Sequence, residues 1–394
     1  MKPFRILVTD GEQRSSLAIV RSLGAAGHFV AVTSTTGRSL TGASRYSRED
    51  FSVPDALEEP EGFGEAVIGL VERNSIDVVF PVTEASLRVL LPQRSRLPGV
   101  LVPSPDYETF SRVSDKNFIL AAASRLGIAV PEQVVLENRD SAACLEFDYP
   151  LVLKPCVSVV RERGRSHKLR VLHASDRRQL DEALGTLPDA AFPVLAQRRI
   201  VGPGVGIFLL IWDGITKAVF AHRRIREKPP SGGVSTYRES IEVPAEWVAQ
   251  AERLLNSVGW SGVAMVEFKV DQESSRPYLM EINGRFWGSL QLAVDAGVDF
   301  PLLLLAAATG EELPDPPKPL SGIRLRWELG DADHLLARLF KPAAVLNLPE
   351  ECPSRLATLL DIVLAWRPGD RWEVFRPSDP RPFLRELRLW LQGR

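Results

Sequence analysis

Two apolar segments that each contain one glutamate, AMVEFKVD (264–271) and YLMEINGRFWGS (278–289), decide the fold of this chain. Both are rich in residues that favour β-strands, and the polar stretch between them is typical of a hairpin connection. In a hairpin without a bulge, centred near Ser274, Glu267 lies directly opposite Glu281. The sequence therefore predicts two carboxylates that face each other on one side of an antiparallel sheet.

This facing pair of glutamates predicts a bound cation. Like charges placed opposite each other on an apolar sheet are destabilising unless a cation lies between them. Asn283 follows Glu281 by two residues and therefore lies on the same face of the strand. Two carboxylates and an amide oxygen are hard ligands that suit Mg²⁺, with phosphate oxygens in the remaining positions. The competing interpretation is that Lys269, on the same face, merely neutralises one carboxylate, but the complete set with Arg285 favours the metal site.

Two arginines near these strands suggest an anion site. Arg285 continues the face of Asn283 if the strand continues, and a guanidinium beside a metal that binds phosphate can stabilise a developing acyl phosphate. Upstream, HRRIR (222–226) leads into a segment that ends in a flexible Gly-Gly turn. This cluster is either a solvated run of charge or a site in which Arg224 binds a carboxylate or a transferred phosphate.

The N-terminal part of the chain alternates between strand-like and helix-like patterns. Arg5–Val8, Phe29–Val32 and Asp77–Pro81 are short apolar runs with helical periodicity between them. This alternation predicts a parallel, doubly wound sheet, and the long runs of strands behind it predict α+β domains. The dinucleotide fingerprint GxGxxG is missing after the first strand, where TDGEQRSS (9–16) stands instead. That absence argues against a nicotinamide oxidoreductase.

Composition and charge exclude several classes of protein. The 394 residues suffice for two or three domains, and 45% hydrophobic with 25% charged residues describes a soluble globular protein. A net charge of −2 offers no attraction for nucleic acid or an anionic membrane. The longest apolar stretch, 300–308, is too short to span a bilayer, and the N-terminus carries no signal-peptide pattern. Three cysteines without a CxxC pair indicate a reducing compartment, so we expect a cytoplasmic protein.

Further motifs extend the pattern over most of the chain. In order they are SDKNF (114–118), YPLVLKP (149–155) and VLAQRRIVGPG (194–204), ahead of the basic cluster and the two glutamate segments. With these motifs the chain resembles the ATP-grasp superfamily of carboxylate–amine ligases, in particular its carbamoyl-phosphate-synthase-like and D-aspartate-ligase-like members. The resemblance implies a fold with α/β and α+β parts, in which a Rossmann-like pre-ATP-grasp domain precedes a two-lobed ATP-grasp fold.

The resemblance also implies four regions and two candidate lids. The regions are a Rossmann-like domain (1–105), a small lobe with a lid (106–190), a large lobe with the metal site (191–318) and a C-terminal, helix-containing extension of unassigned role (319–394). The candidate lids are residues 157–170 and the loop 228–236.

Cofactors and site residues follow from the same resemblance. ATP and two Mg²⁺ ions, which Mn²⁺ can replace, are the implied cofactors. The nucleotide contacts fall on Lys116, Lys154, Gln197, Arg198 and Arg199, with Lys154 on the α- and β-phosphates and the other three in a hinge against adenine. The metal ligands are Glu267, Glu281 and Asn283, and the acyl phosphate is held by Arg224 and Arg285.

The implied reaction joins a small-molecule carboxylate to an amine, or to a thiol, through an acyl phosphate, with release of ADP and phosphate. Amino acids or small peptides are the implied substrates, and a homodimer is left open. Two alternatives share the motifs, namely an ATP-grasp kinase and a non-catalytic ATP-binding module. Biotin carboxylases carry a glutamate where this chain has Ser289, so carboxylation is set aside.

Two departures from the family pattern concern the nucleotide. The loop CVSVVRERGRSHKLR (156–170) contains one glycine and many arginines, whereas the corresponding loop in the family is usually glycine-rich. Either Arg161, Arg163 and Arg165 replace backbone contacts with charge, or this lid works differently. In the hinge, Arg198 stands where the family commonly carries an acidic residue, so the contacts to ribose are left unassigned.

Overall fold

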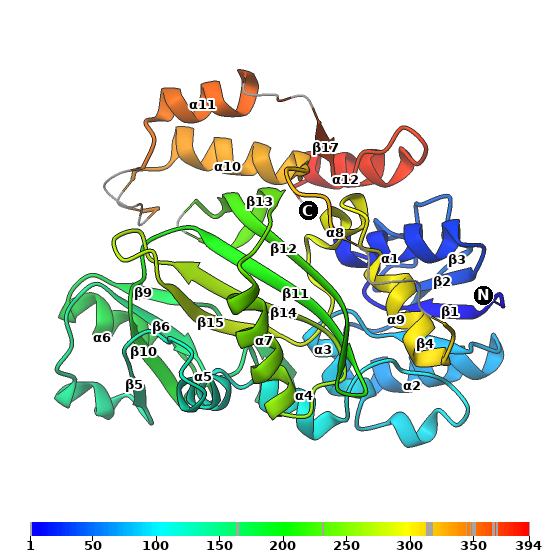
Figure 1. Cartoon of the computed structure of the whole chain (residues 1–394), viewed down its shortest axis with the longest axis horizontal. Coiled ribbons are helices and arrows are strands. Elements are labelled where there is room, and N and C mark those ends of the chain that lie inside the picture. Colours follow the sequence, from blue (N-terminus) through cyan, green and yellow to red (C-terminus); the bar gives the residue numbers. More distant parts are fainter. Residues whose placement is uncertain are drawn as a thin grey trace.

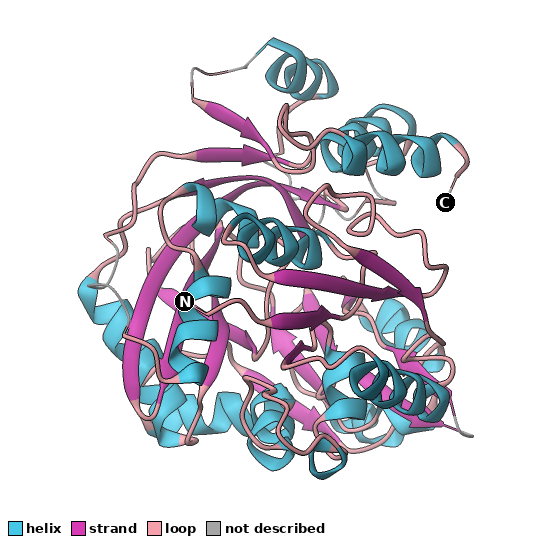
Figure 2. Ribbon diagram, turned by 90° about the vertical axis from the view of Figure 1, so that its right-hand side faces the viewer, coloured by secondary structure: helices cyan, strands magenta, loops and turns pink. Residues whose placement is uncertain are grey.

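The structure of the protein is a computed structural model. It describes residues 2–162, 165–230, 232–312, 318–343, 345–346, 348, 352–364, 367 and 369–393, without the side chains of 144 and 162–167. These residues form three larger sheets and one small hairpin, with helices packed around them (Figures 1 and 2). No helix among them combines the length and the apolar character needed to cross a membrane.

The N-terminal sheet is parallel, as the alternating pattern predicts. Its order is β3-β2-β1-β4, with the neighbouring strands paired in parallel. The strands are β1 (Arg5–Val8), β2 (Phe29–Ser34), β3 (Glu49–Ser52) and β4 (Val78–Phe80), and the helices between and after them are α1 (Arg14–Ala25), α2 (Pro60–Arg73) and α3 (Glu84–Leu90). Thr83 caps α3, because its side chain accepts a hydrogen bond from the Ser86 amide.

The second sheet is antiparallel, with the order β5-β10-β6-β9. Its strands are β5 (Gln133–Leu136), β6 (Leu151–Pro155), β9 (Leu172–Ala174) and β10 (Val194–Arg198), flanked by α6 (Arg177–Gly185). Two helices, α4 (Tyr107–Ser114) and α5 (Lys116–Arg125), come before this sheet in the chain. The helix is interrupted at Asp115, because this residue is extended and its side chain accepts a hydrogen bond from the Phe118 amide at the start of α5. A hairpin of β7 (Val159–Glu162) and β8 (Arg165–Lys168) lies in the candidate lid segment.

The third and largest sheet has the order β15-β14-β11-β12-β13-β16-β17. Its strands are β11 (Gly204–Trp212), β12 (Ile215–Lys228), β13 (Val234–Ser240), β14 (Gly262–Val270), β15 (Pro277–Asn283), β16 (Arg324–Arg326) and β17 (Asp370–Trp372). The helices α7 (Ala245–Ser257), α8 (Leu290–Asp295) and α9 (Phe300–Thr309) belong to the same part of the chain. All neighbouring strands pair antiparallel except β16 and β17.

The C-terminal extension is part of this sheet. Its helices α10 (Glu328–Phe340), α11 (Arg355–Leu364) and α12 (Arg381–Leu391) lie at the top of Figure 1. It also supplies two strands, β16, which pairs with β13, and β17, which pairs with β16 at the sheet edge. The sequence alone indicated only helices here, because a strand of three residues carries no readable alternation. The extension therefore continues the fold of the preceding region.

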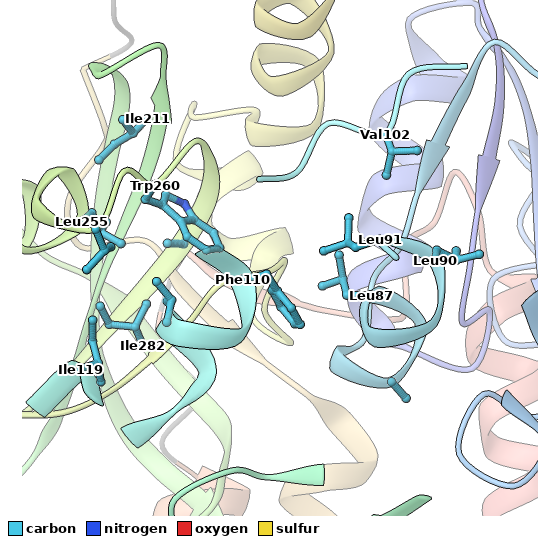
Figure 3. Close-up of a cluster of buried hydrophobic side chains, with 14 of the residues drawn as sticks. Leu87, Leu90, Leu91, Val102, Phe110, Ile119, Ile211, Leu255, Trp260 and Ile282 are labelled. Carbon is cyan, nitrogen blue, oxygen red and sulfur yellow. The ribbon is translucent and has the colours of Figure 1, made fainter. Parts of the chain in front are cut away.

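One apolar cluster connects the N-terminal sheet to the largest one. Leu87 and Val102 from the N-terminal region, Phe110 from α4 and Trp260 before β14 belong to the same buried core (Figure 3). Ile282 of β15 also belongs to it, so the strand that carries the metal-ligand candidates is packed against this core. This packing fixes β15 relative to the N-terminal region.

Candidate functional site

Glu267 of β14 and Glu281 of β15 pair directly across the two strands. Opposite residues of an antiparallel pair lie on the same face, so the two carboxylates face each other as expected. The expectation of a hairpin without a bulge is wrong, because Phe268 pairs with Leu279 and Met280 is the extra residue. The bulge lies on the turn side of the glutamates and leaves their pairing intact.

Each of these glutamates has its own cation. Arg224 of β12 forms an ion pair with Glu267, while Lys116 Nζ lies 3.3 Å from a carboxylate oxygen of Glu281. Burial raises the pKa of Glu267, although Arg224 opposes the shift. Burial alone would also raise the pKa of Glu281, but Lys116 and Lys154 outweigh it and hold that pKa below its usual value. Both carboxylates are therefore compensated by cations within the chain.

Lys269 does not replace these cations. Its Nζ donates to the backbone carbonyl of Ile200 at 3.4 Å, and it makes no ion pair with either glutamate among the described residues. The simpler interpretation of the sequence, in which Lys269 neutralises one carboxylate, is therefore not supported by the geometry.

Asn283 and Arg285 continue the site beyond Glu281. The Asn283 Nδ2 donates to Glu281 Oε1 at 3.1 Å, and the Arg285 Nη2 donates to Asn283 Oδ1 at 3.1 Å. Glu281, Asn283 and Arg285 thus form a hydrogen-bonded row. Two carboxylates and one amide oxygen form a hard donor set that fits Mg²⁺ when phosphate oxygens complete the coordination.

Two cavities meet at this row. The first, which we call the interlobe cavity, has a volume of about 870 Å³ and is lined by Lys154, the hinge residues, Arg224 and Glu267. The second, the N-terminal cavity, has a volume of about 500 Å³ and lies between the N-terminal sheet, Lys116 and the lid segment. Glu281, Asn283 and Arg285 line both cavities. A molecule in one cavity therefore meets a molecule in the other at the metal-ligand candidates.

The two lysines approach the site from different elements. Lys154 of β6 lines the interlobe cavity with its Nζ 3.6 Å from Met280 Sδ, and burial lowers its pKa to about 8. Lys116 is the first residue of α5 and donates to Ser158 Oγ at 3.0 Å. A cation at a helix start is unfavourable with respect to the helix dipole, and the ion pair with Glu281 compensates for it.

The hinge residues lie along one edge of the interlobe cavity. Gln197 is buried, with its Nε2 2.5 Å from Gln133 Oε1. The amides of Arg198 and Arg199 donate within the chain, to the carbonyl oxygens of Glu132 (2.9 Å) and Pro150 (3.4 Å).

The next residue along the hinge differs. The amide of Ile200, which also lines the interlobe cavity, has no hydrogen-bond partner in the described part of the chain. It is therefore the hinge amide that remains for a ligand.

Sequence reasoning missed Glu227. Arg224 Nη1 donates to Glu227 Oε1 at 2.8 Å, so Arg224 binds Glu227 and Glu267 together. In a regular strand, residues three apart point to opposite faces. Two irregularities in the β12–β13 pairing, on either side of Arg226, bring Glu227 back to the side of Arg224. No sequence pattern marks such bulges.

Two histidines in the interlobe cavity were also missed. His222 is buried and its Nε2 lies 2.9 Å from Ser289 Oγ, which is the position that separates this chain from biotin carboxylases. Burial holds the pKa of His222 well below its usual value, so the ring is neutral. Burial, with Arg199 and Lys269 nearby, lowers the pKa of His173 to about 4. Neutral rings in a cavity lined by arginines add no further positive charge to it.

The lid candidates are only partly described. Ser158, Val159 and Arg170 line the N-terminal cavity, and Arg161 forms an exposed ion pair with Glu61 of α2. Arg163 and the side chain of Arg165 lie outside the described residues, and so does one residue of the loop 228–236. In that loop the carbonyl of Gly233 accepts a hydrogen bond from Arg224 at 3.2 Å.

Comparison with known proteins agrees with this arrangement. A family model described as "ATP-grasp in the biosynthetic pathway with Ter operon" matches residues 199–330, which include Arg224 and all three metal-ligand candidates. Over these residues the chain is similar to the ATP-grasp family. The predicted fold class, with α/β and α+β parts, agrees with the sheets described above and with solved structures of similar fold.

A curated relative is similar to a longer part of the chain. The vancomycin/teicoplanin A-type resistance protein of Enterococcus faecium is 24% identical over an alignment of 235 residues, and the match covers 54% of this chain and 64% of the relative. The matched part thus spans less than two thirds of that relative's length.

Solved structures of ATP-grasp proteins share the fold. An L-amino acid ligase from Bacillus licheniformis superposes with a TM-score of 0.61 at 19% identity, over 82% of this chain and 76% of the other. N5-carboxyaminoimidazole synthetase from Staphylococcus aureus, in complex with ADP, gives 0.64 at 16% identity over 86% of each chain. Biotin carboxylase from Campylobacter jejuni gives 0.63 at 17% identity, over 80% of this chain and 74% of the other.

Proposed function

We propose that this protein is an ADP-forming ATP-grasp ligase that activates a small-molecule carboxylate as an acyl phosphate and joins it to an amine. The observation that carries the proposal is the row of Glu281, Asn283 and Arg285 at the junction of the two cavities. ATP occupies the interlobe cavity in this proposal, and its terminal phosphate meets the carboxylate at that row. A protein that only binds adenine has no need of these residues together.

Each candidate residue has a part in this reaction. Lys154 and Lys116 bind the phosphates as point charges. Gln197, Arg198 and Arg199, with the free amide of Ile200, form the adenine edge. Two metal ions, Mg²⁺ or Mn²⁺, would be held by Glu267, Glu281 and Asn283. Bound Mg²⁺ would neutralise the charge that spreads over the transferred phosphoryl group.

The arginines act on the activated carboxylate. Arg285 and Arg224 line the interlobe cavity on either side of the glutamates, where a guanidinium can hold an acyl phosphate with two parallel hydrogen bonds. Arg224 is kept in place by Glu227 and Glu267. The hairpin of the lid segment excludes water, which would otherwise hydrolyse the intermediate. Amino acids or small peptides are the proposed substrates, since an L-amino acid ligase is among the structural relatives.

The test is release of ADP and phosphate from Mg²⁺-ATP across a panel of amino-acid pairs. We expect turnover that depends on both amino acids, with a coupled product, and its loss in Glu281→Ala. Glu273→Ala is the matched control, because Glu273 lies exposed in the connection of the same hairpin. Tight ATP binding without turnover on the whole panel would favour the non-catalytic module, and transfer of phosphate without a coupled amine would favour a kinase.

A further inference from the structure

The N-terminal cavity has walls of opposite charge. Its acidic wall, formed by the N-terminal region, consists of Glu12, Asp55 and Glu84. Its basic wall, formed by α5, the lid segment and the strand end of β15, consists of Lys116, Lys168, Arg170 and Arg285. Such separation orients a molecule that carries both charges, with its cation toward the N-terminal region.

The acidic wall lies where a parallel sheet places its ligands. Glu12 follows β1, Asp55 follows β3 and Glu84 follows β4, so all three stand beyond the carboxyl ends of the strands. Open parallel sheets bind ligands at this edge, near the point where the strand order reverses. In this sheet that point lies between β1 and β4.

Each of these carboxylates is held by one oxygen only. Glu12 Oε1 accepts from the Thr35 amide (2.9 Å) and hydroxyl (3.0 Å), and Asp55 Oδ1 accepts from the amides of Leu57 (2.7 Å) and Glu58 (3.2 Å). The second oxygen of each has no partner within the described ranges. These carboxylates are oriented by the fold and keep an acceptor free for a ligand.

Glu84 is likewise held by only one of its oxygens, and it lies beside the metal-ligand candidates. Its Oε1 accepts two hydrogen bonds from Arg88, at 3.0 and 2.9 Å, and its Oε2 has no partner among the residues that the structure describes. Glu84 also lines a small recess together with Lys116, Glu281 and Arg285. Among the three carboxylates of the acidic wall, Glu84 alone lines this recess, beside the row of Glu281, Asn283 and Arg285.

Asp10 shows the difference between a structural and a free carboxylate. It lines the same cavity, but both of its oxygens accept hydrogen bonds, Oδ1 from the Thr83 hydroxyl (3.0 Å) and Oδ2 from Ser86 (2.7 Å). Asp10 therefore closes the β4–α3 turn and offers nothing to a ligand.

We propose that the amine substrate binds in the N-terminal cavity as an ammonium ion facing the acidic wall, and that Glu84 accepts its proton. This inference rests on the proposed function, because it needs an acyl phosphate at Arg285. Val53, Leu57 and Phe63 also line this cavity, so the substrate has an apolar body beside its ammonium group. The basic wall would receive a carboxylate of the same molecule.

The step balances without a further reactant. One N–H bond of the ammonium breaks, and its proton passes to the free oxygen of Glu84. The nitrogen lone pair then forms the C–N bond with the acyl carbon. The C–O bond to the phosphate breaks with its electron pair on the leaving phosphate, which takes the second proton from nitrogen. A general base is required here because an ammonium ion has no lone pair with which to attack.

Glu84→Gln with hydroxylamine as a competing nucleophile tests this role. Hydroxylamine is unprotonated at neutral pH, so it attacks an acyl phosphate without a base and gives a hydroxamate. With the amino-acid pair that turns over fastest, we expect Glu84→Gln to lose amine coupling by about 10²-fold or more. Hydroxamate formation should fall by less than about threefold, since the acyl phosphate still forms.

Further variants separate binding from proton transfer. Glu12→Gln and Asp55→Asn should raise the KM of the amine and leave kcat within about twofold. Glu72→Gln, on the exposed side of α2, is the control and should change neither constant. Binding of Mg²⁺-ADP should be unchanged in all four variants and reports that each is folded, because none of the four residues lines the interlobe cavity.

The outcomes separate this inference from the proposed function. Equal loss of coupling and hydroxamate in Glu84→Gln, with Mg²⁺-ADP still bound, would overturn the role of Glu84. An unchanged KM in both Glu12→Gln and Asp55→Asn would overturn the ammonium site. Absence of any hydroxamate from the unsubstituted enzyme would overturn the acyl phosphate itself, and the inference with it.

Discussion

Arg224 binds Glu227 and Glu267 at the same time, and this bridge ties β12 to the glutamate pair on β14 and β15. The guanidinium has donors on both of its terminal nitrogens, which a lysine ammonium cannot distribute over two carboxylates in the same way. Burial alone would lower the pKa of Arg224, but Glu267 and Glu227 outweigh it and hold that pKa above its usual value, so its charge is permanent.

We therefore expect Arg224→Lys to lower the turnover of ATP by about 10²-fold, with the fold retained. The adjacent Arg223→Lys is a matched control, because Arg223 forms a more exposed ion pair with Glu239 on the other face of β12. Steady-state kinetics on both variants check the prediction. Equal effects of the two substitutions would contradict it.

We expect the affinity for nucleotide to depend on pH through the charge of Lys154. Its pKa of about 8 lies below the ordinary lysine value, so Lys154 loses its charge between pH 7 and 9.5. If the phosphates bind only the charged form, the affinity for ADP falls by up to about 30-fold over this range. Titration calorimetry at several pH values measures this decline.

Lys154→Arg is the matched variant for that measurement. Arginine keeps its charge throughout, so the variant should show a flat affinity over the same range. A decline as steep in Lys154→Arg as in the unsubstituted protein would assign the pH dependence to another group.

The sequence specified those parts of the fold and site in which local patterns dominate. The pairing of Glu267 with Glu281 was predicted from two β-rich segments around a turn, although the bulge at Met280 that accompanies this pairing was not. The parallel N-terminal sheet followed from alternating periodicity in the same way. In both cases the pattern that carries the prediction lies within single strands and helices.

Other features depend on tertiary packing and could not be predicted. Glu227 reaches Arg224 only because β12 is irregular around Arg226, and nothing in the sequence marks that distortion. Strands β16 and β17 form by pairing with the sheet edge and lack any pattern of their own. The acidic wall of the N-terminal cavity unites residues that follow three different strands, and only the sheet order brings them together.

His173 predicts a loss of stability in acid. Burial, followed by Arg199, Lys269 and Lys154, lowers its pKa to about 4 in the folded protein, against an ordinary value near 6.5 when unfolded. The unfolded chain therefore binds a proton that the folded chain does not, and the free energy of unfolding falls as pH drops below about 6.5. Urea unfolding at pH 7 and 5 should show a loss for the unsubstituted protein that is roughly 1 to 2 kcal/mol larger than for His173→Gln. Equal losses would show that His173 is solvated.

Replacement of Glu373 should have a large effect on the free energy of unfolding. Just after β17, it forms ion pairs with Arg14 at the start of α1 and with Arg238 of β13, whose side chain is 0% exposed. Glu373→Ala leaves a buried guanidinium without its partner, which should cost about 3–5 kcal/mol of unfolding free energy. Glu65→Ala breaks an exposed pair with Arg96 and should leave the unfolding midpoint unchanged. A loss below about 1 kcal/mol for Glu373→Ala would mean that water reaches Arg238.

Gly284 lies between Asn283 and Arg285, and its missing side chain leaves space for the ring of Trp260. A Cβ atom at this position would lie 2.3 Å from the outer ring of Trp260, which is fully buried. Gly284→Ala must therefore displace the backbone between Asn283 and Arg285 or push the indole aside. We expect a loss of about 1–3 kcal/mol in stability, together with reduced ATP turnover.

Trp260→Phe provides the test of that mechanism, because phenylalanine lacks the indole atoms that the new methyl group would meet. Alone it should destabilise the core by leaving a cavity. Combined with Gly284→Ala it should be less harmful than the sum of the two changes, and turnover should recover toward that of Trp260→Phe. Additive losses would mean that the methyl group acts on Asn283 and Arg285 by a route other than Trp260.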